Sequence, residues 1–192
     1  PAGTSAARIN SFLGAACGLV GIAAACSENR MENAVTAQVG DDVSLQEQDP
    51  HQGGGRLALL AMDDTSVYGE STTVSIGGTV AAGISVARAY RTSDVQAALG
   101  GSVADFDTVS ARAESEGALT AKSQASAGGI YGSGAGAGAV AKEDVKTTAY
   151  IRPGAQIGTA GHGVGDVTVL SAIEPDIYAG SFGVAVSGGV SM

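Results

Sequence analysis

The sequence lacks tryptophan, and its 192 residues include only 3 phenylalanines and 5 tyrosines. A conventional globular core depends on large side chains, each of which removes much apolar area from water. Glycine and alanine are abundant instead, with 30 and 35 residues. Small side chains pack well only in thin, regular layers, where each one stacks on its equivalent in the next layer. The 4 prolines are too few for a proline-rich linker or a collagen-like chain.

Basic residues are also scarce, with 10 Lys and Arg against 19 Asp and Glu and a formal net charge of −9. The arginines are scattered and form no run. A nucleic-acid groove needs a positive field to attract phosphates, so nucleic acid is not an expected partner.

Only two cysteines occur, Cys17 and Cys26, in an apolar stretch. They fit two small buried residues of a strand region, and a disulfide is left open because it requires Cβ atoms about 4 Å apart. No Cys-x-x-Cys motif and no neighbouring histidine accompany them, so neither a metal site nor a cofactor is expected.

The apolar stretch over residues 9–26 follows Arg8 and has the character of a signal-peptide core. Part of it also aligns with two later segments of the chain, and a cleaved leader should not share a repeat. We therefore interpret it as repeat sequence. Outside it, no stretch approaches the roughly 20 apolar residues that a membrane-spanning helix needs, so no membrane span is expected.

The chain repeats itself. "GIAAACSENRMENAVTAQVGDDV" from Gly21 is echoed by "GISVARAYRTSDVQAALGGSV" from Gly83 and by "GAGAVAKEDVKTTAYIRPGAQI" from Gly136. Each copy leads to an Ala-x-apolar triplet that ends at Val39, Leu99 or Ile151. Units of this size cannot bury their apolar faces alone and must stack. The sequence thus predicts one segment, residues 1–192, with degenerate repeats at about 18–82, 83–135 and 136–192 and a surface loop at 46–55.

The repeats are expected to form strands. Apolar and polar residues alternate at residues 73–76 and 166–169, which is the period of a half-buried strand. A second recurring triplet, apolar-x-Ala, occurs at residues 59–61, 109–111 and 170–172. Glycine clusters fit tight turns. These features predict an all-β solenoid with about 20 residues per coil, roughly nine coils and a length of roughly 40 Å. Its open ends would expose unpaired edges, which suggests a piece of something longer.

The repeats resemble those of leukotoxin-type filamentous adhesins, large bacterial exoproteins of the filamentous-haemagglutinin class. The similarity is carried by "GAVAKEDVKTTAYIRPGAQI", "GDVTVLSA" and "YAGSFGVAVSGGVSM", and it extends over residues 18–192 in weaker form. It implies a right-handed parallel β-helix built from three degenerate repeats. It also implies two-partner secretion through an outer-membrane protein, a secreted or cell-surface location, and a virulence role in attachment to host-cell or matrix protein and glycan receptors. The resemblance carries over no functional residues.

Catalysis is not expected, although one alternative is open. "GHG" at residues 161–163 resembles an element of the β-helical pectin hydrolases, which act through paired carboxylates. Candidate pairs are Asp41 with Asp42 and Asp63 with Asp64, near His162. Asp64 and His162 are far apart in the sequence, however, and no Arg-Ile-Lys follows. A polysaccharide-acting enzyme is therefore the alternative to a non-catalytic adhesin segment.

Charged patches recur at equivalent places in the repeats, as "SENRMEN", "ARAYRTSD" and "AKEDVKT". We expect them to form one solvated edge of the rod. Within them, Tyr90 is flanked by Arg88 and Arg91. These three residues are the predicted binding site.

Overall fold

A computed structural model describes residues 2–47 and 55–191, and it confirms an all-β parallel β-helix. The strands are β1 (Ala2–Cys17), β2 (Val20–Gln38), β3 (Ser44–Gln46), β4 (Arg56–Gly77), β5 (Val80–Leu99), β6 (Ser102–Ala104), β7 (Thr108–Gly129), β8 (Gly132–Ile151), β9 (Gln156–Ile157), β10 (Asp166–Ser187) and β11 (Val190–Ser191). None of the described residues lies in a helix, so the described chain has no helix that could cross a membrane. Most of the predicted 46–55 loop, residues 48–54, lies outside the described residues.

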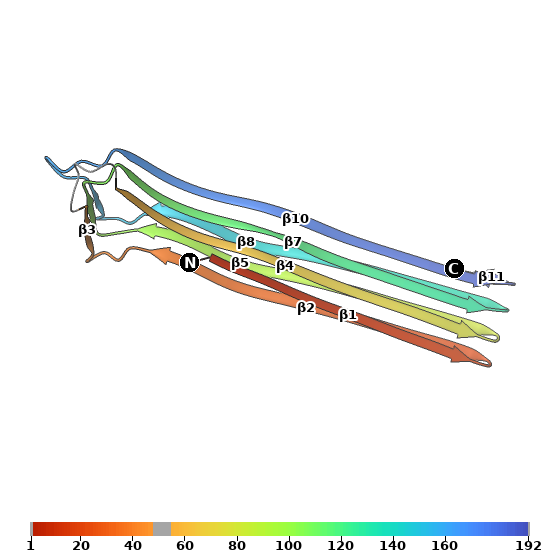
Figure 1. Ribbon diagram of the computed structural model, residues 1–192. Coiled ribbons are helices and arrows are strands. Elements are labelled where there is room, and N and C mark those ends of the chain that lie inside the picture. The colour runs from red at the N-terminus through yellow and green to blue at the C-terminus, as the bar shows by residue number, and fades with distance from the viewer. Residues whose placement is uncertain (1, 48–54, 192) are drawn as a thin grey trace.

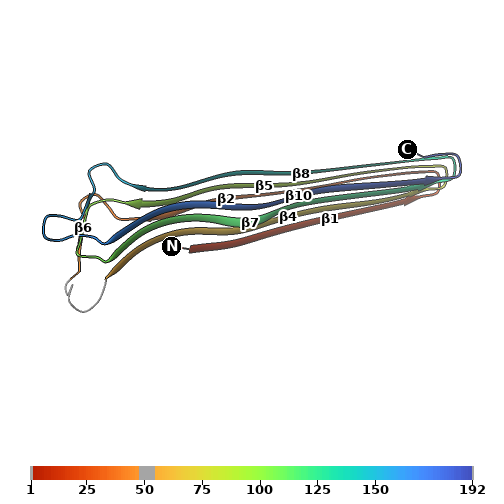
Figure 2. The same ribbon diagram turned by 90° about the horizontal axis from the view of Figure 1, so that it is seen from above.

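The strands form three parallel sheets (Figure 1). The first sheet has the order β1-β4-β7-β10, the second β11-β8-β5-β2 and the small third β3-β6-β9. Short turns join the first sheet to the second at one end of the molecule, here called the turn end. The third sheet lies at the opposite end, here called the loop end. Figure 2 shows the two long sheets as two layers joined at the turn end.

The coil is much larger than the sequence predicted. Val20 pairs with Val80, and Val80 pairs with Gly132. The chain therefore makes one full coil between Val20 and Val80 and a second between Val80 and Gly132. Each sequence repeat therefore closes one coil. The expectation of many short coils was wrong because the strands run for up to 22 residues, or about 70 Å, without a corner. The long axis follows the strands, and the coils stack across it.

The register confirms one repeat alignment and corrects the other. Ala37 pairs with Ala97 and Ala97 with Ala149, so the Ala-x-apolar triplets stack as predicted. In the second triplet, Ala111 pairs with Leu59 and Val169 instead of with the predicted alanines. Apolar-x-apolar patterns occur at several offsets along these strands, and only pairing selects one of them.

The interior narrows toward the turn end. At the loop end it is filled by larger apolar side chains such as Leu59, Leu99 and Val109. At the turn end the backbones nearly touch, since a Cβ added to Gly21 would lie 2.4 Å from the carbonyl oxygen of Ile76. Only glycine, alanine, serine and threonine fit there.

This narrowing inverts the expected polarity at residues 73–76. Thr73 and Ser75 are buried, whereas Ile76 is 57% exposed. The Thr73 hydroxyl donates to the carbonyl oxygen of Ile84 at 2.9 Å, which satisfies its polar group across the two sheets. Large side chains at the turn end must point outward.

Candidate functional site

The predicted binding residues do not share a surface. Tyr90 and Arg88 lie on the outer face of the second sheet, because side chains alternate along β5. Arg91 points the other way, into the space between the sheets, and is only 2% exposed. A ligand on the outer face would therefore not reach its guanidinium group. The charged patches stack in register, as predicted, but the expectation of one solvated edge was wrong, since alternate members face inward.

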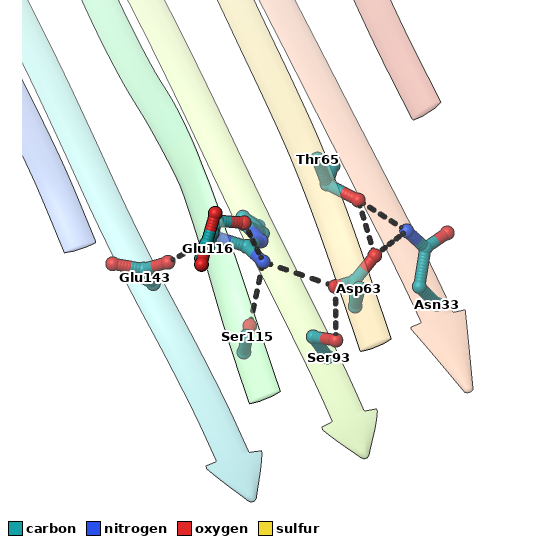
Figure 3. Close-up of polar contacts among 8 residues, drawn as sticks. Asn33, Asp63, Thr65, Ser93, Ser115, Glu116 and Glu143 are labelled. Carbon is teal, nitrogen blue, oxygen red and sulfur yellow. Dashed lines mark hydrogen bonds and ion pairs between the residues drawn. The ribbon is translucent and has the colours of Figure 1, made fainter. Parts of the chain in front are cut away.

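Arg91 is the centre of a buried polar network with residues from β2, β4, β5, β7 and β8. Figure 3 shows Asp63, Ser115 and Glu143 on different strands around the centre of this network. Its Nη2 lies 3.0 Å from Oδ2 of Asp63 on β4, and its Nη1 lies 2.8 Å from Oε1 of Glu143 on β8. Nη2 also donates to the Ser115 hydroxyl and to the carbonyl oxygen of Glu116, both at 2.7 Å on β7. A buried charge is tolerated only when it is paired and hydrogen-bonded, and these contacts meet both conditions.

Asp63 accepts three further hydrogen bonds. The hydroxyls of Ser93 and Thr65 donate to it at 2.5 Å, and the Asn33 amide donates at 2.9 Å. Burial raises the pKa of Asp63, but the hydrogen bonds from Ser93, Thr65, Arg91 and Asn33 outweigh it and hold the pKa below its usual range. The carboxyl group is therefore an anion at neutral pH.

The backbone is adapted to this network. The pairing of β4 with β7 stops at Asp64 and Glu116 and resumes at Val67 and Leu119. Gly117, in this gap, has a φ of 143°, and a Cβ there would lie 2.0 Å from the carbonyl oxygen of Thr65. Glycine is required because no other residue fits this conformation and this space. Arg91 then bonds the Glu116 carbonyl beside the gap.

The network is suited to fixing register and not to turning over a substrate. Arg91, Asp63 and Ser115 are each at most 2% exposed. The network also lies between two apolar clusters, one around Val95 and Leu99 and the other around Val67 and Leu119. A slip of one residue in any participating strand would turn its polar group outward and leave charge unpaired. The sequence does place Asp63 and Glu143 at positions that alternate with outward-facing residues. It could not identify the network, because it does not show which of the two alternating sets faces inward.

The outer face around Tyr90 carries a shallow hollow of about 170 Å³ that is also lined by Arg30, Thr92, Lys142 and Asp144. Arg91 borders the same hollow, although its side chain is only 2% exposed and its guanidinium group pairs in the interior. Arg30 and Lys142 pair in register with Tyr90 on the two neighbouring strands. The Arg30 guanidinium carbon lies 5.7 Å from the centre of the Tyr90 ring, within the range of a cation–π contact. Tyr90 is thus flanked by cations, although Arg30 and Lys142 take the place that was predicted for Arg91.

The residues proposed for hydrolysis are dispersed. Asp63 is buried in the network, while its neighbour Asp64 points to the opposite face of the strand. Asp41 lies 3.4 Å from Arg152 in an ion pair at the loop end.

His162 has a separate partner. Its Nδ1 lies 2.9 Å from Oδ2 of Asp105, to which the Gln46 amide also donates at 2.6 Å. These contacts, the one from Gln46 most strongly, lower the pKa of Asp105.

Among residues 2–47 and 55–191, no three His, Cys, Asp or Glu side chains are placed to hold a metal ion. Cys17 and Cys26 are both free and exposed, so the interpretation of two buried cysteines was wrong and the disulfide left open at the sequence level is not formed. No protein-family model, curated protein or solved structure matches this chain.

Proposed function

We propose that this chain is a non-catalytic segment of a secreted bacterial filamentous adhesin. It would act as an extended β-helical stalk in attachment to host cells or matrix, and it would reach the cell surface by two-partner secretion. The observation that supports the proposal is the stacking of whole repeats, in which each repeat forms one coil and pairs with the next along its long strands. Such an architecture lengthens by addition of repeats and transmits force through many parallel hydrogen bonds.

The stalk would be broad. Each coil adds only one strand spacing, about 4.8 Å, along the stacking axis. The strands meanwhile extend for about 70 Å across that axis. Such a ribbon offers two wide outer faces, and this shape favours multivalent weak contacts over long reach.

The hollow around Tyr90 is the proposed receptor contact. Its ring and two flanking cations could stack on and pair with a polar ligand, and all three side chains sit on adjacent strands that fix their spacing. Arg91 follows Tyr90 on β5, and its interior ion pair with Asp63 holds this part of the strand in place. This contact favours a fixed position for the Tyr90 ring on the outer face.

The test is binding of the purified chain to arrays of glycans and extracellular-matrix proteins. For any hit, Tyr90→Ala should weaken binding about tenfold, since loss of one partly buried aromatic contact costs about 1.4 kcal/mol or more. Tyr150→Ala is the matched control, because Tyr150 is another outward-facing tyrosine of the same sheet, 36% exposed. Equal loss in both variants would reject the Tyr90 site, and no binding to any surface would reduce the proposal to a passive stalk.

A turnover assay on each polysaccharide hit tests the alternative of a polysaccharide-acting enzyme. Release of new reducing ends would overturn the non-catalytic proposal. The dispersal of Asp63, Asp64 and His162 favours binding without turnover.

A further inference from the structure

The outer face of the first sheet carries a second hollow, of about 160 Å³, over β7 and β10. Here it is called the Lys122 hollow. The register places Lys122 beside Gly180 and Gln124 beside Phe182. The hollow is lined by Lys122, Ser123, Gln124, Tyr178, Gly180, Ser181 and Phe182. It belongs to the first sheet, whereas the Tyr90 hollow belongs to the second, so the two lie on opposite faces of the molecule.

The Lys122 hollow exists because Gly180 has no side chain. Tyr178 and Phe182 flank it on the same strand, about 13 Å apart at the rise of a β-strand. Both rings are more than half exposed. The Tyr178 ring leans over Gly180, since a Cβ added there would lie 2.5 Å from the Tyr178 hydroxyl oxygen. Two aromatic side chains thus stand on either side of a floor of bare backbone.

Lys122 supplies the only charge among the described residues that line this hollow. Its Nζ lies 5.7 Å from the centres of both the Tyr68 and the Tyr178 rings. It forms no ion pair with any residue that the structure describes. In a protein with a net charge of −9, the Lys122 hollow is therefore a local site of attraction for an anionic group.

The nearest carboxylates lie outside the hollow. Glu70 pairs in register with Lys122, but on β4, the neighbour on the other side. Its Oε2 accepts a hydrogen bond from the Tyr68 hydroxyl at 2.9 Å, and its strand is two spacings, about 10 Å, from that of Gly180. Asp176 precedes Tyr178 on β10, on the side away from which the Tyr178 ring leans. Glu70 weakens the field of Lys122 but leaves its β10 side to a ligand.

An acidic sugar matches this combination of side chains. A pyranose ring has apolar C–H faces, which pack on aromatic rings, and a rim of hydroxyls, which bond to an amide such as that of Gln124. A carboxylate on the sugar would pair with Lys122 in a charge-assisted hydrogen bond. A small anion would leave the rings of Tyr178 and Phe182 uncovered, and a neutral sugar would leave Lys122 unpaired.

An acidic peptide fits less well. Peptides bind to sheets mainly through main-chain hydrogen bonds to a free strand edge. Under the Lys122 hollow, β7 and β10 pair with each other, so the backbone groups between them are already bonded. Only side chains remain to contact a ligand on this face, and sugar hydroxyls can use them.

We propose that the Lys122 hollow binds a uronic acid unit of a polysaccharide. The sugar carboxylate pairs with Lys122, and the sugar ring lies over Gly180 between Tyr178 and Phe182. This proposal does not depend on the attachment role or on the Tyr90 hollow, since it concerns the other face of the molecule.

The test compares matched acidic and neutral ligands by isothermal titration calorimetry with the whole chain. A tetrasaccharide of β-1,4-linked glucuronic acid differs from cellotetraose only in a carboxylate that replaces the hydroxymethyl group of each sugar. Tetragalacturonic acid is a second acidic ligand with different ring stereochemistry. We expect at least one acidic ligand to bind about tenfold more tightly than cellotetraose, because one charge-assisted contact is gained. This preference should shrink as salt is added.

Lys122→Gln tests the ion pair. It should reduce the affinity for the acidic ligand about tenfold, to that for cellotetraose, because the charge is lost and the rings remain. Lys146→Gln is the matched control, since it makes the same change at an exposed position of β8 on the second sheet. Its affinity should equal that of the unchanged protein.

Gly180→Val tests the floor of the hollow. It should weaken binding of the acidic ligand at least about tenfold, because the new side chain fills the space of the sugar ring. The added Cβ meets the movable end of the Tyr178 side chain, so the fold should be retained, as circular dichroism can verify. Gly136→Val is the matched control, since Gly136 is exposed on β8 and has no atom within 4 Å of an added Cβ.

Several outcomes would overturn the proposal. One is no binding of either acidic ligand, and another is equal binding of the acidic and neutral tetrasaccharides. Equal losses in Lys122→Gln and Lys146→Gln would indicate a general effect of charge. Binding that is lost in Tyr90→Ala and kept in Lys122→Gln would assign the sugar to the Tyr90 hollow. Equal competition by a tetraglutamate peptide would identify an acidic protein segment as the occupant.

Discussion

Removal of the Asp63 carboxylate should be among the most destabilising single changes in this protein. Asp63→Ala leaves the Arg91 guanidinium buried without its closest first-sheet carboxylate, and it deprives the Ser93 and Thr65 hydroxyls of their acceptor. Breaking a buried ion pair by deletion of one partner costs about 3–5 kcal/mol. For a chain of this length, such a loss lowers the melting temperature by roughly 10 °C.

A double-mutant cycle separates the pair from its surroundings. Arg91→Met removes the cation, and the double variant with Asp63→Ala removes both charges. We expect the double variant to be at least about 2 kcal/mol more stable than the sum of the single losses predicts, because neither Asp63 nor Arg91 is then an unpaired charge. Loss of the Arg91 contact to Glu143 is common to Arg91→Met and the double variant, so it cancels in the cycle. Chemical denaturation of the four proteins gives the coupling free energy.

The control is a surface pair, Arg112 with Glu114, whose nitrogen and oxygen lie 2.5 Å apart. Arg112→Ala should cost no more than about 1 kcal/mol. Additive losses in the cycle, or a loss for Asp63→Ala as small as for Arg112→Ala, would refute the assignment of Arg91 and Asp63 as a coupled interior pair.

Two further predictions concern the interior. Gly21→Ala should destabilise by roughly 1–3 kcal/mol in thermal unfolding, because its Cβ would meet the backbone oxygen of Ile76 at 2.4 Å. Gly134→Ala is its control, since no atom lies within 4 Å of the added Cβ, and an equal loss there would reject the steric explanation. Acid should also destabilise the protein through Asp63, whose pKa is lower in the folded than in the unfolded chain. This contribution is fully present above the ordinary aspartate pKa of about 4 and is lost as pH falls toward the lowered value. Asp63→Asn should therefore flatten the fall in stability below about pH 4, and an unchanged acid limb would contradict the prediction.

The repeat pattern alone identified the architecture. Gly/Ala-rich segments, recurring triplets and period-two alternation predicted stacked parallel strands, and the pairing of Ala37, Ala97 and Ala149 confirms the alignment on which that prediction depended. Local signals are sufficient here because every repeat carries the same pattern, so that a weak preference is repeated in each coil.

The size of the coil could not be obtained in this way. Long strands and short strands show the same alternation, and only the position of the true corners distinguishes them. Internal glycines such as Gly69 and Gly83 do not mark corners. In the structure they lie within strands, because the opposite sheet approaches too closely for a side chain.

The sequence by itself determined the all-β class, the parallel stacking and the presence of degenerate repeats, because these follow from composition and periodicity. The tertiary structure decided which face of each strand is buried. That choice depends on the distance between the two sheets, which no single strand encodes. It turned Arg91 from a predicted surface residue into the centre of the interior network, and it turned Ile76 and its neighbours outward at the turn end.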